Sequence, residues 1–384
     1  MYYCLIIANL TIEKLMSHFK IVEIADIHFG NGRIAPSDTY ENLNKFVYPQ
    51  LEDANLFVIN GDTFDTMLNM NSDAGFYVAQ FINDAITLAS KCNFFIRVVR
   101  GTFSHDRHQN RFFLVRGREN MILNDRPLIK VYDTIAIENF NGMNFLFCPD
   151  NLPFKDLTQE VIDVIEANHL KEVDGVFSHG YFNHLLPDNL PHIPTDTLNW
   201  ELLKNKVKGY VLNGHVHHMS VKDRVISSGS FERFDHSTTE KVGFWVINIE
   251  DGKWTPTFIE NKNAVEFRTF YPLIDAPDED LVQQIKNYIG SLIYDGYPAT
   301  KPIYIRIAGK DNGISQTIKS EYPNVIVSIT PPKSLQEETT DNSDIICGVL
   351  PSITEDNLPE LIHQAIEPKD VLSLDTIKEI LNAI

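Results

Sequence analysis

Aspartate and histidine residues recur in five short motifs, and each motif follows a run of apolar residues typical of a buried strand. In chain order the motifs are Asp26-Ile27-His28, Gly61-Asp62-Thr63-Phe64-Asp65, Ser104-His105-Asp106, Ser178-His179-Gly180 and Gly214-His215-Val216-His217. Carboxylates and imidazoles are common ligands of divalent metals. Loops that meet at one sheet edge could therefore hold two metal ions, an arrangement that hydrolyses phosphate esters.

The ligand chemistry indicates how these residues could share two metals. Two ions about 3.5 to 4 Å apart need a bridging carboxylate, and Asp62 is the candidate because it follows an apolar strand and a tight glycine. Asp26 and His28 alternate in an extended segment, so both reach one metal only if the strand is already turning into a loop. His215 and His217 point the same way and could serve one metal or two neighbouring ones.

A purely structural role is the alternative for each motif taken alone. An Asp-x-His pair occurs often by chance, His179 could be a core histidine, and the segment from Gly214 to His218 could be only a turn. The structural interpretation is favoured for four other histidines, His108, His184, His192 and His236. The occurrence of all five motifs in one order at strand ends favours the metal site.

Composition limits the classes of protein that fit. With 384 residues, a mass of 43.9 kDa and 43% hydrophobic residues, the chain can form a large domain and a smaller one. Four separated cysteines without a CxxC pair argue against a zinc knuckle or a disulfide framework and favour a reducing cytoplasm. The net charge of −19 argues mildly against nucleic acid, although acids outnumber bases eleven to two from Ser334 to Ile384 alone. No membrane partner is expected, because the apolar stretch from Tyr2 to Leu10 is too short to span a bilayer.

The spacing of apolar residues predicts an α/β (α+β) fold. Buried strands are predicted ahead of the motifs, at 56–59, 94–99, 176–177 and 210–212. Helical patterns cover 37–51 and 73–91, and a further helix begins at Asp156 with Gln159 in the capping-box position. After Gly209 only strands follow, which favours a two-sheet β-sandwich flanked by helices over a single doubly wound sheet.

A smaller α/β unit begins where the motifs end. It is predicted to contain a helix at 278–294 and strands at 266–270, 303–307 and 325–329. The predicted segments are an N-terminal extension without an assigned role at 1–15, a motif-bearing domain at 16–262, the small C-terminal α/β domain at 263–332, an acidic linker at 333–357 and C-terminal helices at 358–384. The apolar face of the last helix requires a partner surface.

The motifs resemble those of the calcineurin-like metallophosphoesterase superfamily, whose pattern is Asp-x-His, Gly-Asp, Gly-Asn-His, His and Gly-His-x-His. The resemblance covers roughly residues 19–259. The Gly-Asp-x-Phe-Asp form, the His-Asp that closes the third motif and the small α/β unit are similar to the SbcD family of DNA repair and recombination nuclease subunits from bacteria and phages. This resemblance implies the metallophosphoesterase fold, capped by a small domain that guides DNA.

The resemblance also implies roles for individual residues. One metal would be held by Asp26, His28, Asp62 and His217, and the second by Asp62, His179 and His215. Two Mn²⁺ ions are the expected cofactors, with Mg²⁺ as the alternative. His105 would lie near the scissile phosphate and assist the leaving group, and Asp65 would orient or polarise that histidine.

The third motif departs from the family pattern. Where relatives read Gly-Asn-His-Asp, this chain reads Gly101-Thr102-Phe103-Ser104-His105-Asp106, so the amide ligand to the second metal is missing. Ser104 takes the position directly before the histidine. Because a hydroxyl is a weaker ligand than an amide carbonyl, either Ser104 binds the second metal directly or through water, or that site is weak.

A basic patch follows the third motif, and phenylalanines lie within it. Its members are Arg107, Arg111, Arg116 and Arg118. We expect them to contact DNA phosphates, which would make binding fall steeply with salt. Pairing with surface acids is the alternative.

The expected function is a Mn-dependent DNA exonuclease and endonuclease subunit that hydrolyses phosphodiester bonds. The resemblance implies DNA as substrate, an SbcC-like coiled-coil ATPase held by the C-terminal helices, and a homodimer. A small-molecule or phosphoprotein phosphoesterase is the first alternative, which the acidic charge favours and the second domain and apolar terminal helix oppose. A catalytically inactive scaffold is the other, suggested by the altered third motif and opposed by the retained ligands.

Overall fold

The computed structural model describes residues 18–114, 121–150, 152, 156–186, 197–271, 278–309 and 312–330. The chain divides into two compact units, Met1–Pro332 and Lys333–Ile384, and the second lies outside the described residues. The predicted extension at 1–15, linker at 333–357 and helices at 358–384 lie outside them as well. In the described part the fold is mixed α/β with several multi-stranded sheets, as predicted. The domain boundary at residue 263 stays a prediction.

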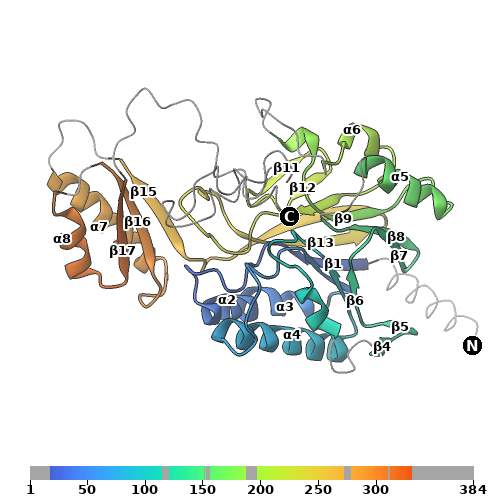
Figure 1. Ribbon diagram of the computed structural model, residues 1–384, viewed down its shortest axis with the longest axis horizontal. Coiled ribbons are helices and arrows are strands. Elements are labelled where there is room, and N and C mark those ends of the chain that lie inside the picture. Colours follow the sequence, from blue (N-terminus) through green and yellow to red (C-terminus); the bar gives the residue numbers. More distant parts are fainter. Residues whose placement is uncertain are drawn as a thin grey trace, which may run out of the picture. The chain divides into compact units, whose positions relative to one another are not determined.

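The first sheet has six strands in the order β14-β13-β1-β2-β3-β6 (Figure 1). Its strands are β1 (His18–Ile24), β2 (Leu56–Asn60), β3 (Phe95–Val99), β6 (Ile129–Tyr132), β13 (Gly243–Glu250) and β14 (Lys253–Glu260). The first four of these run parallel, and β13 pairs antiparallel with β1. Every residue of β2 is buried, which agrees with its continuous apolar sequence.

Helices cover one face of the first sheet and lie together below the strands in Figure 1. They are α2 (Pro36–Asn42), the π-helical turn η1 (Leu43–Val47), α3 (Tyr48–Leu51) and α4 (Asp73–Cys92). The side chain of Ser72 caps α4 by accepting a hydrogen bond from the Gly75 amide, and Asn93 ends the helix in the left-handed conformation. The helical segments predicted at 37–51 and 73–91 are confirmed.

The second sheet also has six strands, in the order β11-β12-β10-β9-β8-β7. Its strands are β7 (Ala136–Phe140), β8 (Met143–Cys148), β9 (Gly175–His179), β10 (Val211–Gly214), β11 (Ser220–Lys222) and β12 (Val225–Ser227). β8, β9, β10 and β12 run parallel to one another, and the edge strands β7 and β11 are antiparallel.

Aromatic side chains from both six-stranded sheets form one buried cluster. Phe19 of β1 stacks on Phe145 of β8 with ring centroids 5.8 Å apart, and Tyr132 of β6 stacks on Phe147 of β8 at 4.2 Å. Burial of such large apolar surfaces is the main stabilising contribution to folding. The two sheets therefore share a core.

Two helices, α5 (Leu157–Ala167) and α6 (Trp200–Leu203), pack on the other side of the second sheet, against alternate residues of its strands. The predicted start of α5 is confirmed, because the Asp156 side chain accepts a hydrogen bond from the Gln159 amide at 3.0 Å. The short elements that remain in this region are η2 (Gln109–Leu114), β4 (Ile122–Leu123), β5 (Arg126–Pro127) and η4 (Asn183–Leu185).

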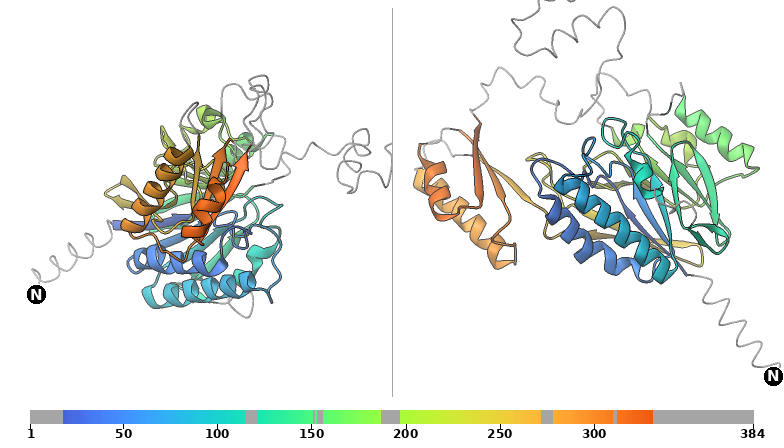
Figure 2. Two further views of the ribbon diagram at one scale, coloured as in Figure 1. Left: turned by 90° about the vertical axis from the view of Figure 1, so that its left-hand side faces the viewer. Right: turned by 60° about the horizontal axis from the view of Figure 1, so that its bottom comes forward.

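A three-stranded parallel sheet follows, with two helices that cover it in Figure 2. The elements are β15 (Glu266–Phe270), α7 (Asp278–Tyr294), β16 (Ile303–Ala308), α8 (Ile314–Glu321) and β17 (Val325–Thr330), close to the predicted ranges. Phe267 and Tyr304 of this sheet pack with Ile34 and Phe234 of the preceding region. Among the described residues no helix is long and apolar enough to cross a bilayer.

Strand direction places the five motifs at the carboxyl ends of the parallel strands in the two six-stranded sheets. Because β1, β2 and β3 run parallel, the residues that follow them emerge at one edge of the first sheet. His179 is the last residue of β9, and His215 follows the neighbouring parallel strand β10. The shared core then brings these two edges together.

Candidate metal centre

Four residues of the first, second and fifth motifs have an unusual backbone conformation. Asp26, His28, Asp62 and His215 all have positive φ, with values of 51°, 51°, 47° and 84°. The left-handed region costs a residue with a Cβ about 1 kcal/mol or more. The amides of Asp26 and His28 donate to the carbonyls of Gly61 and Asp62 at 3.1 and 3.0 Å, which holds the first two motifs side by side.

The first group of potential ligands contains Asp26, His28 and His217. The Nε2 atoms of the two histidines are 3.1 Å apart, and they lie 3.8 and 3.7 Å from Asp26 Oδ1. Asp26 and His28 reach one point because their left-handed backbone turns the strand into a loop. The Asp26 carboxylate also accepts a hydrogen bond from the His215 amide at 3.0 Å, which ties the fifth motif to the first.

The second group contains Asp62, His179 and His215. His179 Nε2 lies 3.2 Å from Asp62 Oδ2, and His28 Nε2 of the first group lies 3.9 Å from the same oxygen. Asp62 therefore stands between the two groups, the place in which a bridging carboxylate is needed. His215 and His217 belong to different groups. The sequence left open whether they serve one metal or two neighbouring ones, and the structure places one histidine in each group.

A glycine makes the close approach of His179 to Asp62 feasible. The His179 Nδ1 donates to the carbonyl oxygen of Asn60 at 2.8 Å, which turns Nε2 toward Asp62. Gly61 has φ of +87°, and a Cβ at this position would lie 2.0 Å from His179 Nδ1. The glycine of the second motif therefore serves both the turn and the packing of the imidazole.

The predicted catalytic pair, His105 and Asp65, is brought together, and His28 joins it in a third group of potential ligands. The His105 Nδ1 forms a short hydrogen bond with the backbone carbonyl of Asp65, and because a carbonyl only accepts, Nδ1 carries the proton. The Asp65 carboxylate lies 3.3 Å from His28 Nδ1 and accepts a hydrogen bond from the side-chain amide of Asn31. Asp65 thus orients His105 through its main chain and a metal-ligand candidate through its side chain.

Asp106 organises the loops of the second and third motifs, a role that sequence reasoning missed. Its buried carboxylate accepts hydrogen bonds from the amides of Gly101 at 2.8 Å, Asp62 at 3.1 Å and Phe64 at 3.3 Å. The Asn110 side chain donates a fourth at 2.8 Å. Such a hub fixes the backbone that carries Asp62.

Thr102, rather than Ser104, adjoins the second group. The Thr102 hydroxyl lies 3.2 Å from Asp62 Oδ2 and 3.1 Å from His215 Nδ1, and its amide donates to Asp62 Oδ1 at 2.7 Å. Ser104 is exposed. The sequence could have indicated Thr102, because it directly follows Gly101. In the Gly-Asn-His pattern that the third motif resembles, the asparagine directly follows the glycine in the same way.

Electrostatic interactions favour ionised carboxylates in this centre. Burial alone would raise the pKa of Asp62, but the adjacent His179 lowers it below the usual range. The same pairing raises the pKa of His179 although burial opposes it. Burial lowers the pKa of His217 to about 4, which leaves this imidazole neutral near pH 7. Metals bind charged carboxylates and neutral imidazoles, so an ion at the second group would displace the proton that the raised pKa of His179 favours.

The donor set fits a pair of divalent cations. His179 Nε2 is a buried ring nitrogen without a hydrogen-bond partner, and it points at a carboxylate. The two Nε2 atoms of the first group face each other at hydrogen-bond distance, an arrangement in which both cannot be neutral donors. Cation binding would satisfy all three nitrogens, and mixed imidazole and carboxylate ligands suit Mn²⁺, Zn²⁺ and Fe²⁺.

The predicted DNA-contacting arginines are only partly described. Arg107 is exposed, with Nη1 3.6 Å from the sulfur of Met67, which follows the second motif. Arg111 is also exposed and lies 3.8 Å from Asp133, so part of its charge is paired. Arg116 and Arg118 lie outside the described residues.

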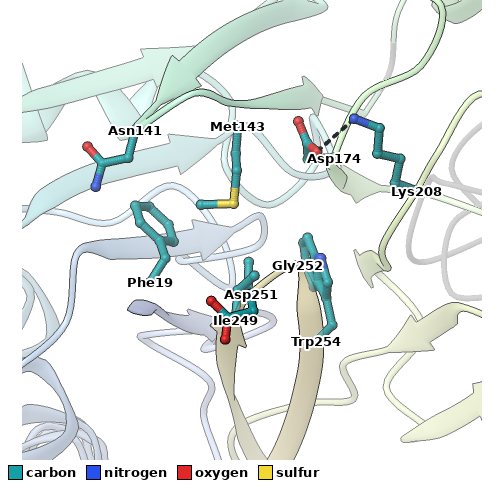
Figure 3. Close-up of a pocket in the computed structure, with 9 residues that line it drawn as sticks. All are labelled: Phe19, Asn141, Met143, Asp174, Lys208, Ile249, Asp251, Gly252 and Trp254. Atoms are coloured by element: carbon teal, nitrogen blue, oxygen red, sulfur yellow. Dashed lines mark hydrogen bonds and ion pairs between the residues drawn. The ribbon is translucent and has the colours of Figure 1, made fainter. Parts of the chain in front are cut away.

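A pocket of about 390 Å³ lies away from this centre (Figure 3). It is lined by Phe19 near the start of β1, by Met143 at the start of β8 and by Trp254, with an ion pair of 3.2 Å between Asp174 and Lys208 on its wall. Phe19 and Met143 lie at the amino ends of their strands, whereas the motifs follow the carboxyl ends, so the pocket and the motifs lie at opposite ends of the strands.

Comparisons with known proteins leave the family open. No family model and no curated protein matches the chain. Among solved structures, GAP50 of the Plasmodium inner membrane complex is similar at 13% identity and a TM-score of 0.38, covering 65% of this chain and 86% of that one. A cold-active protein-tyrosine phosphatase from Shewanella matches at 13% identity and a TM-score of 0.29, covering 62% and 80%. These likenesses are too weak to carry an argument about function.

Proposed function

We propose that this chain is a metal-dependent phosphodiesterase of the calcineurin-like superfamily, acting as an SbcD-type DNA nuclease subunit with two Mn²⁺. The observation that carries this proposal is the position of Asp62 between two ligand groups, with His179 Nε2 3.2 Å and His28 Nε2 3.9 Å from the same carboxylate oxygen. The two sheets with their common aromatic core support the metallophosphoesterase sandwich as the fold.

Each ligand group has a defined part in the proposed chemistry. Asp26, His28, Asp62 and His217 would hold one ion, and Asp62, His179 and His215 the other. Bound metals supply a hydroxide nucleophile near neutral pH and offset the charge on the phosphoryl oxygens. The protein contributes the fixed ligand positions. The Asn60 carbonyl maintains them by accepting a hydrogen bond from His179, and the Asp106 carboxylate does so by accepting one from the Asp62 amide.

His105 is the proposed proton donor to the leaving oxygen. Its Nδ1 is engaged by the Asp65 carbonyl, so Nε2 is the ring atom that can exchange a proton with substrate. Its ring meets that of His28 edge to face, with centroids 4.7 Å apart, which places it at the border of the first ligand group. Half-burial of His105 leaves it accessible to a bound phosphate.

The surface beside His105 suits an unpaired nucleic acid strand. Phe103 and Met67 are 48% and 65% exposed on the two loops that flank this histidine. The loops are tied together, because Gln109 accepts a hydrogen bond from the Leu68 amide. An exposed aromatic ring next to Arg107 can stack on a base while the cation attracts phosphate.

The remaining parts of the proposal follow from the family resemblance. The small α/β unit would guide DNA, the segments at 358–384 would bind an SbcC-like coiled-coil ATPase, and two copies of the chain would form a homodimer. These segments at the C-terminus lie outside the described residues.

Parallel assays of nuclease and phosphomonoesterase activity test the proposal. Purified protein with Mn²⁺ should release nucleotides from labelled linear duplex and single-stranded DNA and should lose this activity with EDTA. Asp62→Asn should abolish cleavage, whereas Asp163→Asn, an exposed change on α5, should leave it intact. Intact DNA in all reactions, including those supplemented with the ATPase, would contradict a nuclease role.

A small-molecule or phosphoprotein phosphoesterase is the competing function. The net charge of −19 favours it, because nucleic acid binding is usually accompanied by a basic surface. In the same assays this function would appear as hydrolysis of a phosphomonoester with no cleavage of DNA.

A further inference from the structure

A hydroxyl oxygen that the family pattern does not supply adjoins the second ligand group. Thr102 Oγ1 lies 3.2 Å from Asp62 Oδ2 and 3.1 Å from His215 Nδ1. Asp62 Oδ2 is also 3.2 Å from His179 Nε2. Adjacent ligands of an octahedral ion with bonds of about 2.1 Å are about 3 Å apart, so these spacings match neighbouring ligands of one cation.

We propose that the Thr102 hydroxyl is the oxygen ligand of the second metal, in the place of the family amide. This inference rests on the proposed two-metal centre. The backbone supports it, because the Thr102 amide donates to Asp62 Oδ1 at 2.7 Å and thereby fixes the threonine against the bridging carboxylate. Gly101 makes this contact feasible, since a Cβ there would lie 2.2 Å from the Asp62 amide nitrogen.

The chemistry of a hydroxyl makes the two metal positions unequal. Hard divalent cations accept neutral oxygen ligands, but an alcohol is a poorer donor than an amide carbonyl. The first group, with Asp26 and two imidazoles, has no such substitution. Manganese therefore fills the first position at lower concentration, and the second position fills only as the concentration rises.

Manganese binding to the full chain tests the role of Thr102 without any substrate. Isothermal titration of metal-stripped protein should give a tight and a weaker Mn²⁺ site. Thr102→Val, which keeps the shape and removes the hydroxyl, should weaken the second site about tenfold or more and leave the first unchanged. Thr102→Asn should tighten the second site, and Ser104→Ala is the matched control that should bind as the original chain does.

Electron paramagnetic resonance gives a second readout. The signal of coupled manganese pairs should require more Mn²⁺ in Thr102→Val and less in Thr102→Asn. Unchanged second-site affinity in both variants, or loss of the second metal in Ser104→Ala, would overturn the assignment. If Thr102→Val does not fold, Thr102→Asn decides, because an affinity no better than that of the original chain contradicts a ligand position.

The outcome separates this inference from the proposed function. Two-site binding that depends on Thr102, together with intact DNA, would remove the nuclease proposal and leave the ligand assignment standing. Cleavage of DNA by a protein whose second-site affinity does not depend on Thr102 would remove the ligand assignment and leave the nuclease proposal standing. Protein that binds no Mn²⁺ at all would contradict both.

Discussion

His105 is the residue at which proton transfer and metal binding can be separated. It hydrogen-bonds to the Asp65 main chain and forms a third group of potential ligands with His28 and Asp65, but the two proposed ligand sets do not include it. We expect His105→Ala to lower DNA cleavage by about 10² to 10⁴, the usual contribution of a general acid. Manganese titration should give the same two affinities as the original chain.

A matched substitution controls for loss of an imidazole. His108 is exposed near the same loop and contacts the ring of Phe103, so His108→Ala should retain most of the activity. Loss of a metal from the His105→Ala protein would instead identify His105 as a structural ligand.

At the residue scale, the sequence predicts which residues come together better than it predicts their individual contacts. Asp26, His28 and Asp62 lie where their motifs indicate, because motif spacing depends on strand ends. Asp65 holds His105 by its main-chain carbonyl and lies beside His28 with its carboxylate, and Thr102 rather than Ser104 adjoins the second group. Both differences arise from loop conformation, which alternation of apolar residues does not encode.

At the scale of elements, the turn that follows β2 gives a prediction about metal binding. Gly61→Ala places a Cβ 2.0 Å from His179 Nδ1 and strains a residue with φ of +87°. We expect the displaced imidazole to abolish Mn²⁺ binding at the second position. The control is Gly142→Ala, which has φ of +86° and no atom within 4 Å of the new Cβ. It carries the same backbone strain, about 1 kcal/mol, and should keep both metals.

Normal metal binding by Gly61→Ala would show that His179 does not need this packing. Equal loss of metal by both glycine variants would attribute the effect to strain alone.

The loops that carry Met67 and Phe103 give a prediction about substrate. Removing a stacking ring costs about 1 to 3 kcal/mol per base, so Phe103→Ala should raise KM for single-stranded DNA at least about fivefold. The control is Phe76→Ala on α4, which removes a ring that is 61% exposed and lies outside these loops. Equal KM values for Phe103→Ala and the original chain would exclude base stacking at this loop.

Elements with strong periodicity are predicted well from the sequence. The ranges expected for α4, α7 and the strands of the three-stranded sheet agree with the structure to within a residue or two, because long amphipathic helices and continuous apolar strands have unambiguous patterns. The π-helical turn η1 was not predicted, since its sequence satisfies an ordinary helical pattern.

At the scale of the whole molecule, a buried polar network joins segments far apart in the chain. The Asn42 side chain of α2 donates to Glu232 Oε1 at 2.6 Å, and Lys301 Nζ of the small α/β region lies 3.3 Å from Asn42 Oδ1 and 3.1 Å from the Asn263 carbonyl. Glu232 and Lys301 are both buried. Burial raises the pKa of Glu232 to about 7.

This network predicts how stability depends on pH. Because the folded chain holds the Glu232 proton more tightly than the unfolded chain, this carboxyl stabilises the fold below pH 4.5, and the stabilisation is lost as pH rises to about 7. Glu232→Gln has no such loss. Its free energy of unfolding relative to the original chain should therefore increase from pH 4.5 to 7, by on the order of 3 kcal/mol. A difference that does not change with pH would contradict the raised pKa.

The most direct test of the two-metal centre is anomalous scattering at the manganese edge from crystals of the full chain grown with Mn²⁺. The account predicts two peaks beside Asp62, one near His28 and His217 and one near His179 and His215, separated by about 3.5 to 4 Å. Absence of any peak beside Asp62, or a lone peak bound by other residues, would contradict it.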